Sequence, residues 1–165
     1  SNEMVARIYA QLHGLPSTGL RFLTVYGPAG RPDMPHFGFT KAIVGGKPIL
    51  VFNEGQLERG FTYIDDIVSG VLAAATTPPL DLELSYRFRN IGNHQPVKLA
   101  DLIATLKGLL GIEANKQLAG IQPGDVYRTA ANVDAARALV DFEPSTDLAT
   151  GLGHLVAWHR DYFRL

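Results

Sequence analysis

The chain has 165 residues, of which 46% are apolar and 19% charged, and its formal net charge is -1. This length buries one substantial core and predicts a single domain over residues 1–165, while the near-neutral charge argues against a nucleic-acid partner, which needs a basic surface. No cysteine is present and no apolar run reaches the roughly 20 residues of a membrane span, so we expect no disulfide, no membrane and a cytoplasmic location.

Apolar spacing and helix or strand breakers divide the chain into short helices and strands. At the start, Met4, Val5 and Ile8 lie at helical spacing, and Gly14 is a plausible helix stop. Asp65 or Asp66 is a suitable N-cap for a later helix. The expected elements, in chain order, are a helix over 3–12, a strand over 18–26, a helix over 37–44, strands over 49–53 and 61–64, a helix over 67–75, a strand over 86–91, and helices over 99–110, 133–140 and 149–163.

This mixture of helices and strands predicts an α/β fold, in the sense of mixed α+β rather than strict alternation. A doubly wound nucleotide-binding domain would open with a strand and a glycine-rich turn. This chain opens on a predicted helix, and its 17 glycines form no G-x-G-x-x-G motif. The pattern is typical of a sequence that starts midway through a fold.

Four motifs carry the chemical information in the chain. They are VYGP at residues 25–28, GRPDM at 30–34, FTYIDD at 61–66 and QPGD at 122–125. In this order and spacing they resemble the extended short-chain dehydrogenase/reductases that act on nucleotide sugars, and among these the UDP-glucuronate 4-epimerase family. The resemblance covers nearly the whole chain, to about residue 163.

The resemblance implies the C-terminal, substrate-binding part of this fold, without the N-terminal Rossmann strands and glycine-rich loop. It places the catalytic Tyr-x-x-x-Lys motif upstream of Ser1, so no catalytic residue is expected in the chain. The implied reaction is NAD-dependent C4 epimerisation of UDP-glucuronate through a 4-keto sugar. We expect the isolated chain to be inactive and not to hold NAD alone, and we expect a homodimer, as a truncated chain exposes apolar faces.

Three candidate residues are expected to contact the sugar and the base of a UDP-sugar substrate. Taken alone, Thr24 is a good strand former, Arg31 a solvated loop arginine and Phe52 a core aromatic residue. The resemblance implies that Thr24 lies near the C4 hydroxyl and that Phe52 stacks on the uracil. It implies that Arg31 binds the C6 carboxylate, which the guanidinium fork matches.

Three further residues are implied to contact the rest of the nucleotide. Arg59 is expected at the diphosphate, Gln122 near the phosphates and Asp125 at the ribose hydroxyls. The family usually has aspartate where this chain has Gly60, a departure that leaves Arg59 intact and loosens the loop that aims it.

Several alternatives stay open at this point. The chain could belong to a nucleotide-sugar 4,6-dehydratase or decarboxylase, or it could be a non-catalytic nucleotide-binding or interaction module. The five histidines show no metal-ligand spacing, so no metal is expected. Trp158, Tyr162 and Phe163 are expected on the core face of the last helix.

Overall fold

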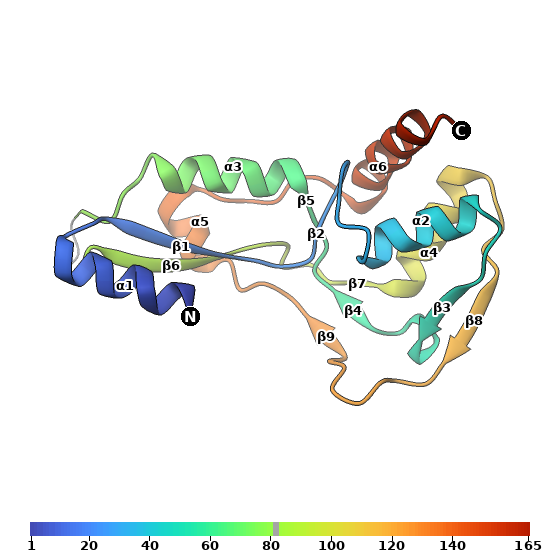
Figure 1. Cartoon of the computed structure of the whole chain (residues 1–165), viewed down its shortest axis with the longest axis horizontal. Coiled ribbons are helices and arrows are strands. Elements are labelled where there is room, and N and C mark those ends of the chain that lie inside the picture. Colours follow the sequence, from blue (N-terminus) through green and yellow to red (C-terminus); the bar gives the residue numbers. More distant parts are fainter. Residues whose placement is uncertain (81–82) are drawn as a thin grey trace.

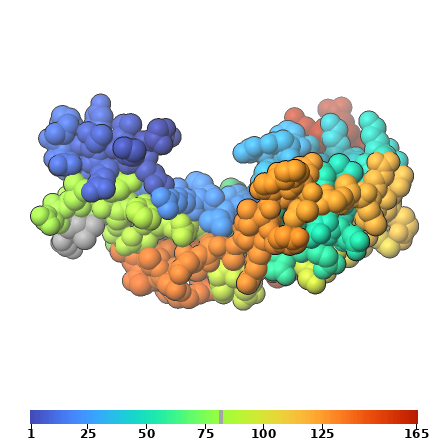
Figure 2. All heavy atoms as spheres, turned by 90° about the horizontal axis from the view of Figure 1, so that it is seen from below, coloured from blue at the N-terminus to red at the C-terminus, as the bar shows by residue number. Residues whose placement is uncertain are grey.

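The computed structural model describes residues 1–80 and 83–165, in which six α-helices and nine short strands form an elongated molecule (Figure 1). The two ends of the molecule each have a hydrophobic core. We call the end that contains α1 the first lobe and the end that contains α2 the second lobe. Figure 2 shows a hollow between α1 and the second lobe. The mixed α/β class that the sequence predicts is confirmed.

The first lobe has a two-stranded parallel sheet between layers of helix. β1 (Ser17–Phe22) pairs with β6 (Tyr86–Ile91), with Ser17 opposite Tyr86 and Phe22 opposite Ile91. α1 (Asn2–His13) lies on one face, and α3 (Ile64–Ala75) and α5 (Asp134–Val140) pack on the other (Figures 1 and 2). The core between the sheet and these two helices is formed by Ile67, Ile91, Ala131, Val133, Ala136 and Phe142.

The apolar stripe that predicts the first helix is exposed in the structure. Only Ala10 of α1 is buried, and Gly14 ends the helix in the left-handed conformation, as expected. The exposed side chains are Met4, Val5, Ile8, Tyr9 and Leu12. The helix is therefore amphipathic, but its apolar side has no cover within the described residues.

The second lobe is built from three helices and a second parallel pair of strands. α2 (Pro35–Val44) and α6 (Leu148–Phe163) pack with α4 (Leu99–Leu110), while β3 (Ile49–Phe52) pairs with β8 (Lys116–Ala119). The helix predicted over 99–110 is confirmed with both bounds. Its fully buried residues, Leu102, Ile103 and Leu106, pack against Leu152 and Leu155 of α6 in one apolar cluster.

Very short strands connect the two lobes. β2 (Val25–Tyr26) runs parallel to β5 (Thr62–Tyr63). β4 (Glu58–Arg59) lies between β7 (Val97–Lys98), which is antiparallel to it, and β9 (Arg128–Thr129), which is parallel. The single-turn helix Asn53–Gly55 leads from β3 towards β4. The sequence predicts none of β4, β7, β8 and β9.

One strand prediction needs correction. The strand expected over 18–26 is two strands, because the chain leaves β6 after Phe22 and joins β5 at Val25. Thr24, at the break, has a φ of 30°, in the positive range that few non-glycine residues adopt. The exchange of one partner strand for another is what bends the chain there.

The two adjacent aspartates do not cap α3. The N-cap is Tyr63 and the helix begins at Ile64, which places Asp65 and Asp66 in its first turn. The Asp66 carboxylate is buried and accepts hydrogen bonds from Ser145 and Thr146. Its role is therefore tertiary: it ties α3 to the segment that precedes α6.

Tyr162 and Phe163 of α6 are also placed differently from the expectation, whereas Trp158 is half-buried and packs against Phe37. The buried face of this helix carries Leu152, Leu155, Val156 and His159, whereas Tyr162 is 66% and Phe163 41% exposed.

In the described part of the chain, no helix has the length and apolar character needed to cross a bilayer.

Candidate functional site

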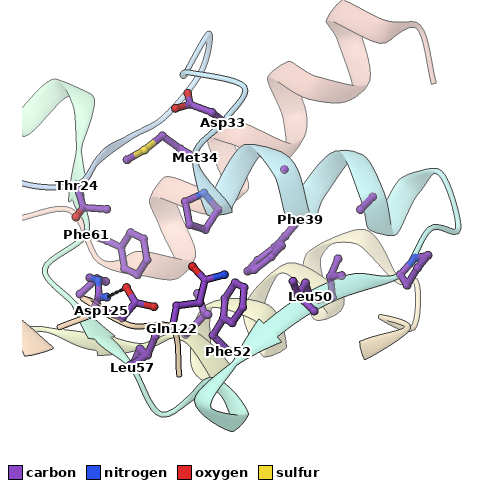
Figure 3. A pocket seen from close by; sticks show the side chains of 17 residues that line it. Thr24, Asp33, Met34, Phe39, Leu50, Phe52, Leu57, Phe61, Gln122 and Asp125 are labelled. Carbon is purple, nitrogen blue, oxygen red and sulfur yellow. Dashed lines mark ion pairs between the residues drawn. The ribbon is translucent and has the colours of Figure 1, made fainter. Parts of the chain in front are cut away.

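A cavity of about 560 Å³ opens where α2, β3, β4 and the loop after β8 meet (Figure 3). Its volume is in the range of small-molecule pockets. Five of the six residues that the sequence predicts for substrate binding line it: Thr24, Phe52, Arg59, Gln122 and Asp125. These residues are far apart in the sequence, so only the tertiary fold brings them together.

These side chains come from strand ends or from the segments between strands. Thr24 lies in the bend between β1 and β2, Phe52 ends β3, and Arg59 ends β4. Gln122 and Asp125 belong to the loop that follows β8, and the Asp125 N–H donates to the Gln122 carbonyl at 3.0 Å, as in a tight turn. The turn expected from the QPGD motif is therefore present.

Arg31 is not among the residues that line this cavity. Its exposed guanidinium binds Asp33 through two hydrogen bonds, from Nε to Oδ1 at 3.1 Å and from Nη2 to Oδ2 at 2.5 Å. The Asp33 carboxylate does line the cavity, and the bond from Arg31 lowers the pKa of Asp33. The GRPDM motif therefore places a carboxylate at the site, which sequence reasoning missed.

Arg59 connects its strand to the loop that carries Asp125. The guanidinium donates from Nη1 to the carbonyl oxygens of Val126 at 2.7 Å and Glu58 at 2.9 Å. Nη2 lies 3.6 Å from Oδ1 of Asp125, the pair drawn dashed in Figure 3. Both side chains are mostly buried, and among the described residues that line the cavity Arg59 is the one with a cationic side chain. A fixed positive charge thus faces the interior of the cavity.

The opposite end of the cavity is apolar. Figure 3 shows Phe52, from β3, and Phe39, from α2, projecting into it beside Leu50 and the Gln122 amide. Thr24, Met34 and Asp33 lie towards the other end. The sequence analysis missed Phe39, Phe61 and Met34 as lining residues. Met34 could have been identified because it is part of the GRPDM motif. Phe39 could not, because it lies in a predicted helix whose apolar spacing does not distinguish a cavity-lining residue from a core residue.

A buried histidine supports the loop that carries Arg31. His36 is fully buried in the first turn of α2, and neither ring nitrogen has a hydrogen-bond partner. Burial lowers the pKa of His36 to about 4. A Cβ at Gly30 would lie 3.1 Å from Nε2 of His36 and 3.1 Å from the Gly27 carbonyl. Gly30 is therefore needed for the close approach of the loop to this ring.

The described residues contain no group of three or more His, Cys, Asp and Glu side chains arranged to hold a metal ion. Asp33 and Asp125 are the carboxylates of the cavity. Each faces an arginine, which satisfies its charge without a metal.

Comparison with known proteins establishes the family. A model of the NAD dependent epimerase/dehydratase family matches residues 1–85, which is more than half of the chain. The chain belongs to this family. Its fold also matches part of the solved structures of such epimerases.

Three relatives illustrate the similarity. Protein CapI of Staphylococcus aureus is 42% identical over 177 residues, covering 99% of this chain and 53% of that protein. UDP-glucuronate 4-epimerase 2 of Arabidopsis thaliana is 42% identical over 176 residues, covering 99% and 41%. The crystal structure of UDP-glucuronic acid 4-epimerase from Bacillus cereus, in complex with UDP-glucuronic acid and NAD, superposes with a TM-score of 0.85 at 30% identity, covering 98% and 51%. The chain therefore spans about half the length of these relatives.

The family uses NAD, but the residues of this chain do not fit a dinucleotide site. The turn between β2 and α2 carries Gly27 and Gly30 without the third glycine of a dinucleotide-binding fingerprint. In that turn the His36 ring packs against Gly30, in the space next to the backbone. None of the six tyrosines is followed four residues later by lysine.

Proposed function

We propose that this chain is the substrate-binding, C-terminal part of an NAD-dependent UDP-glucuronate 4-epimerase. One observation carries the proposal: a single cavity is lined by aromatic side chains, by the Arg59–Asp125 pair and by the polar residues Thr24 and Asp33 (Figure 3). These are the partners that the base, the diphosphate and the sugar of a UDP-sugar require. The similarity to UDP-glucuronate 4-epimerases over half their length supports the choice of substrate class.

In this proposal the uracil stacks on Phe52 at the aromatic end. The ring ends β3, whose backbone is held by pairing with β8, so it is presented without a large entropy cost on binding. Stacking of a base on an aromatic side chain contributes about 1–3 kcal/mol. Gln122, which lies beside Phe52, offers an amide to the neighbouring phosphate.

Arg59 receives the diphosphate. Two of its bonds run to backbone carbonyl groups and keep the guanidinium in place, while the contact to Asp125 at 3.6 Å is longer than a good hydrogen bond. The diphosphate can therefore take over Nη2 at little cost. Asp125 is then released to accept hydrogen bonds from the ribose hydroxyls.

The sugar lies between Thr24 and the GRPDM loop. The unusual backbone of Thr24 directs its side chain to the cavity, where its hydroxyl can bond the sugar C4 hydroxyl. Arg31 reaches the C6 carboxylate after exchanging Asp33 for it. Both partners of that pair are more than 60% exposed, and such surface pairs contribute only about 0–1 kcal/mol, so the exchange is inexpensive.

The hydride chemistry at C4 is assigned in this proposal to residues outside this chain, since the chain offers neither a Tyr-x-x-x-Lys motif nor a dinucleotide fingerprint. The isolated chain should therefore bind a UDP-sugar without converting it. Measurable conversion of UDP-glucuronate by the purified chain would refute this part.

We propose further that the chain associates with itself through the first lobe. The exposed apolar stripe of α1 and the outer edges of the two-stranded sheet leave surface that a covering partner would bury. Light scattering should show a dimer, and a strictly monomeric protein at high concentration would contradict the proposal.

A neutral UDP-hexose is a second candidate substrate, and a specific observation favours it. Asp33 lines the cavity, whereas Arg31, which is paired with it, does not, so among the described residues the sugar end presents no unpaired positive charge that would attract a uronate. The two candidate substrates therefore differ in one testable respect. With UDP-glucuronate the Arg31 guanidinium turns to the sugar carboxylate, and with a neutral UDP-hexose it stays on Asp33.

Calorimetric titration of UDP-glucuronate and UDP-glucose distinguishes the candidates. We expect tighter binding of UDP-glucuronate and loss of that preference in Arg31→Ala. Arg21→Ala is the matched control, because Arg21 is also exposed and also forms a two-bond fork, with Glu3. Equal or tighter binding of UDP-glucose by the unmodified chain would favour the hexose, and binding of neither ligand would overturn the site.

A further inference from the structure

A second cavity, of about 420 Å³, lies between α2 and the end of α6. Gly38 and Ala42 of α2 line this cavity as well as the first one, so one helix forms a wall of both. We call it the lysine cavity, because Lys41 and Lys47 line it together with His159 and Phe163. Its volume is sufficient for a single ring with a charged substituent.

His159 is the buried polar group of this cavity. It is only 3% exposed, and neither ring nitrogen has a hydrogen-bond partner. Its neighbours are aromatic, with ring centroids at 6.0 Å for Phe37 and 4.6 Å for Phe163. An unpaired buried polar group destabilises the folded protein, whereas a phenyl ring would pack here without that cost. A ligand that accepts a hydrogen bond from the ring would remove this penalty.

The charge of the cavity indicates what kind of ligand that is. Lys41 and Lys47 are exposed, and no ion pair among the described residues includes either one. The residues lining the cavity include no aspartate or glutamate. Among the hydrogen bonds of the described residues, none is donated by the ammonium group of Lys41 or Lys47 to a carbonyl group of α2.

We propose that the lysine cavity binds a small organic anion, with a carboxylate or phosphate head on a ring-shaped apolar body. The head lies between the two lysine ammonium groups and accepts a hydrogen bond from the His159 imidazole. The body packs against Phe163 and the Gly38–Ala42 face of α2. A Cβ at Gly38 would meet nothing within 4 Å, so this face is open to a ring.

Burial, with the Lys41 charge as the second cause, lowers the pKa of His159. Near pH 7 the ring is therefore neutral, with one N–H donor and one acceptor nitrogen. The two lysines attract the anion, and the hydrogen bond from the donor nitrogen of His159 orients its head group.

Proton–nitrogen correlation NMR of the full chain tests the proposal, with phenyl phosphate and benzoate as ring-bearing probes and inorganic phosphate as the probe without a ring. At pH 7 we expect saturable shifts at the end of α2 and in α6, with a dissociation constant of about 1 mM or tighter for at least one ring-bearing probe. Inorganic phosphate should bind at least tenfold more weakly. The better of the two ring-bearing probes identifies the head group. Absence of saturable shifts in this region with both would overturn the proposal.

Variants separate this cavity from the first one, whose Arg59 also attracts anions. Lys41→Gln combined with Lys47→Gln should weaken binding at least tenfold, whereas Arg59→Ala and the exposed control Lys116→Gln should leave it unchanged. The reverse pattern would assign the anion to the first cavity and overturn the proposal.

His159→Phe tests the imidazole itself. The phenyl ring fits the aromatic surroundings, so the melting temperature should stay the same or rise while probe affinity falls at least fivefold. Unchanged affinity in a folded His159→Phe variant would show that the nitrogens do not contact the ligand, and would remove the observation on which the site rests.

Discussion

Replacement of Asp66 by alanine should destabilise the protein far more than replacement of its neighbour Asp65. Asp66 is 8% exposed, and its carboxylate accepts from the backbone N–H groups of Ser145 at 3.3 Å and Thr146 at 3.1 Å. The hydroxyls of the same two residues donate to it at 3.4 and 3.2 Å. Asp65 lies in the same helix turn and is exposed.

The expected difference follows from these four bonds. A hydrogen bond to a charged group contributes about 1.5–3 kcal/mol, but two of these bonds are long, and Ser145 is exposed so that water can replace the lost acceptor. We therefore expect Asp66→Ala to cost about 3 kcal/mol in unfolding free energy. The favourable placement of an acidic residue in the first turn is worth about 0.3–1 kcal/mol and is the whole expected cost of Asp65→Ala.

Urea unfolding at pH 7, followed by circular dichroism, measures both values. The melting temperature of Asp66→Ala should fall by about 8 °C, since 1 kcal/mol corresponds to about 2–4 °C at this length. Asp66→Asn keeps the shape and one acceptor oxygen and should lie between alanine and the unmodified protein. Equal losses for Asp65→Ala and Asp66→Ala would refute the tertiary role of Asp66.

Three further predictions concern the first cavity and its surroundings. The pKa of His36 is lowered from 6.5 to about 4, so the unfolded chain binds a proton at higher pH than the folded protein does. The free energy of unfolding should therefore fall by about 3 kcal/mol as the pH decreases from 6.5 to 4. Urea unfolding at pH 4.5 and 7.5 should show a smaller loss for His36→Leu than for the unmodified protein. Phe52→Ala should weaken UDP binding by about 10- to 100-fold in calorimetry if the base stacks on this ring. Gly60→Asp, which introduces the residue expected at this position from the resemblance, should lower the melting temperature because a Cβ at Gly60 would lie 2.6 Å from the Asn93 carbonyl, whereas Gly108→Ala, in open space, should raise it.

The long elements could be predicted because their patterns repeat. The helix over 99–110 and the strand over 86–91 were predicted with both bounds. In each, several apolar or β-forming residues pack against the same neighbouring surface, so together they indicate the type and the extent of the element. β4 and β7 have two residues each. No periodicity exists in two residues, so their pairing depends on neighbours that the local sequence does not describe.

The residues of the first cavity also divide into those that the sequence predicts and those that it does not. Motif resemblance selected Phe52, Arg59 and Asp125, which the fold brings to one cavity. It did not reveal that Arg31 pairs with Asp33, two residues away. Local ion pairs of this kind depend on the conformation of a loop, and Gly27 and Gly30, close to Arg31, allow several conformations.

The position of the first cavity explains why residues remote from it should matter to ligand binding. Its polar side is carried by the bend at Thr24 and by β4, and β4 is held by its pairing with β7 and β9. These segments lie between two cores that share no buried residue. Contacts such as those of Asp66 with the segment before α6 hold the two lobes together. Binding of a ligand that touches both Thr24 and Phe52 would add a further connection, so ligand affinity and the stability of the contact between the lobes should rise and fall together.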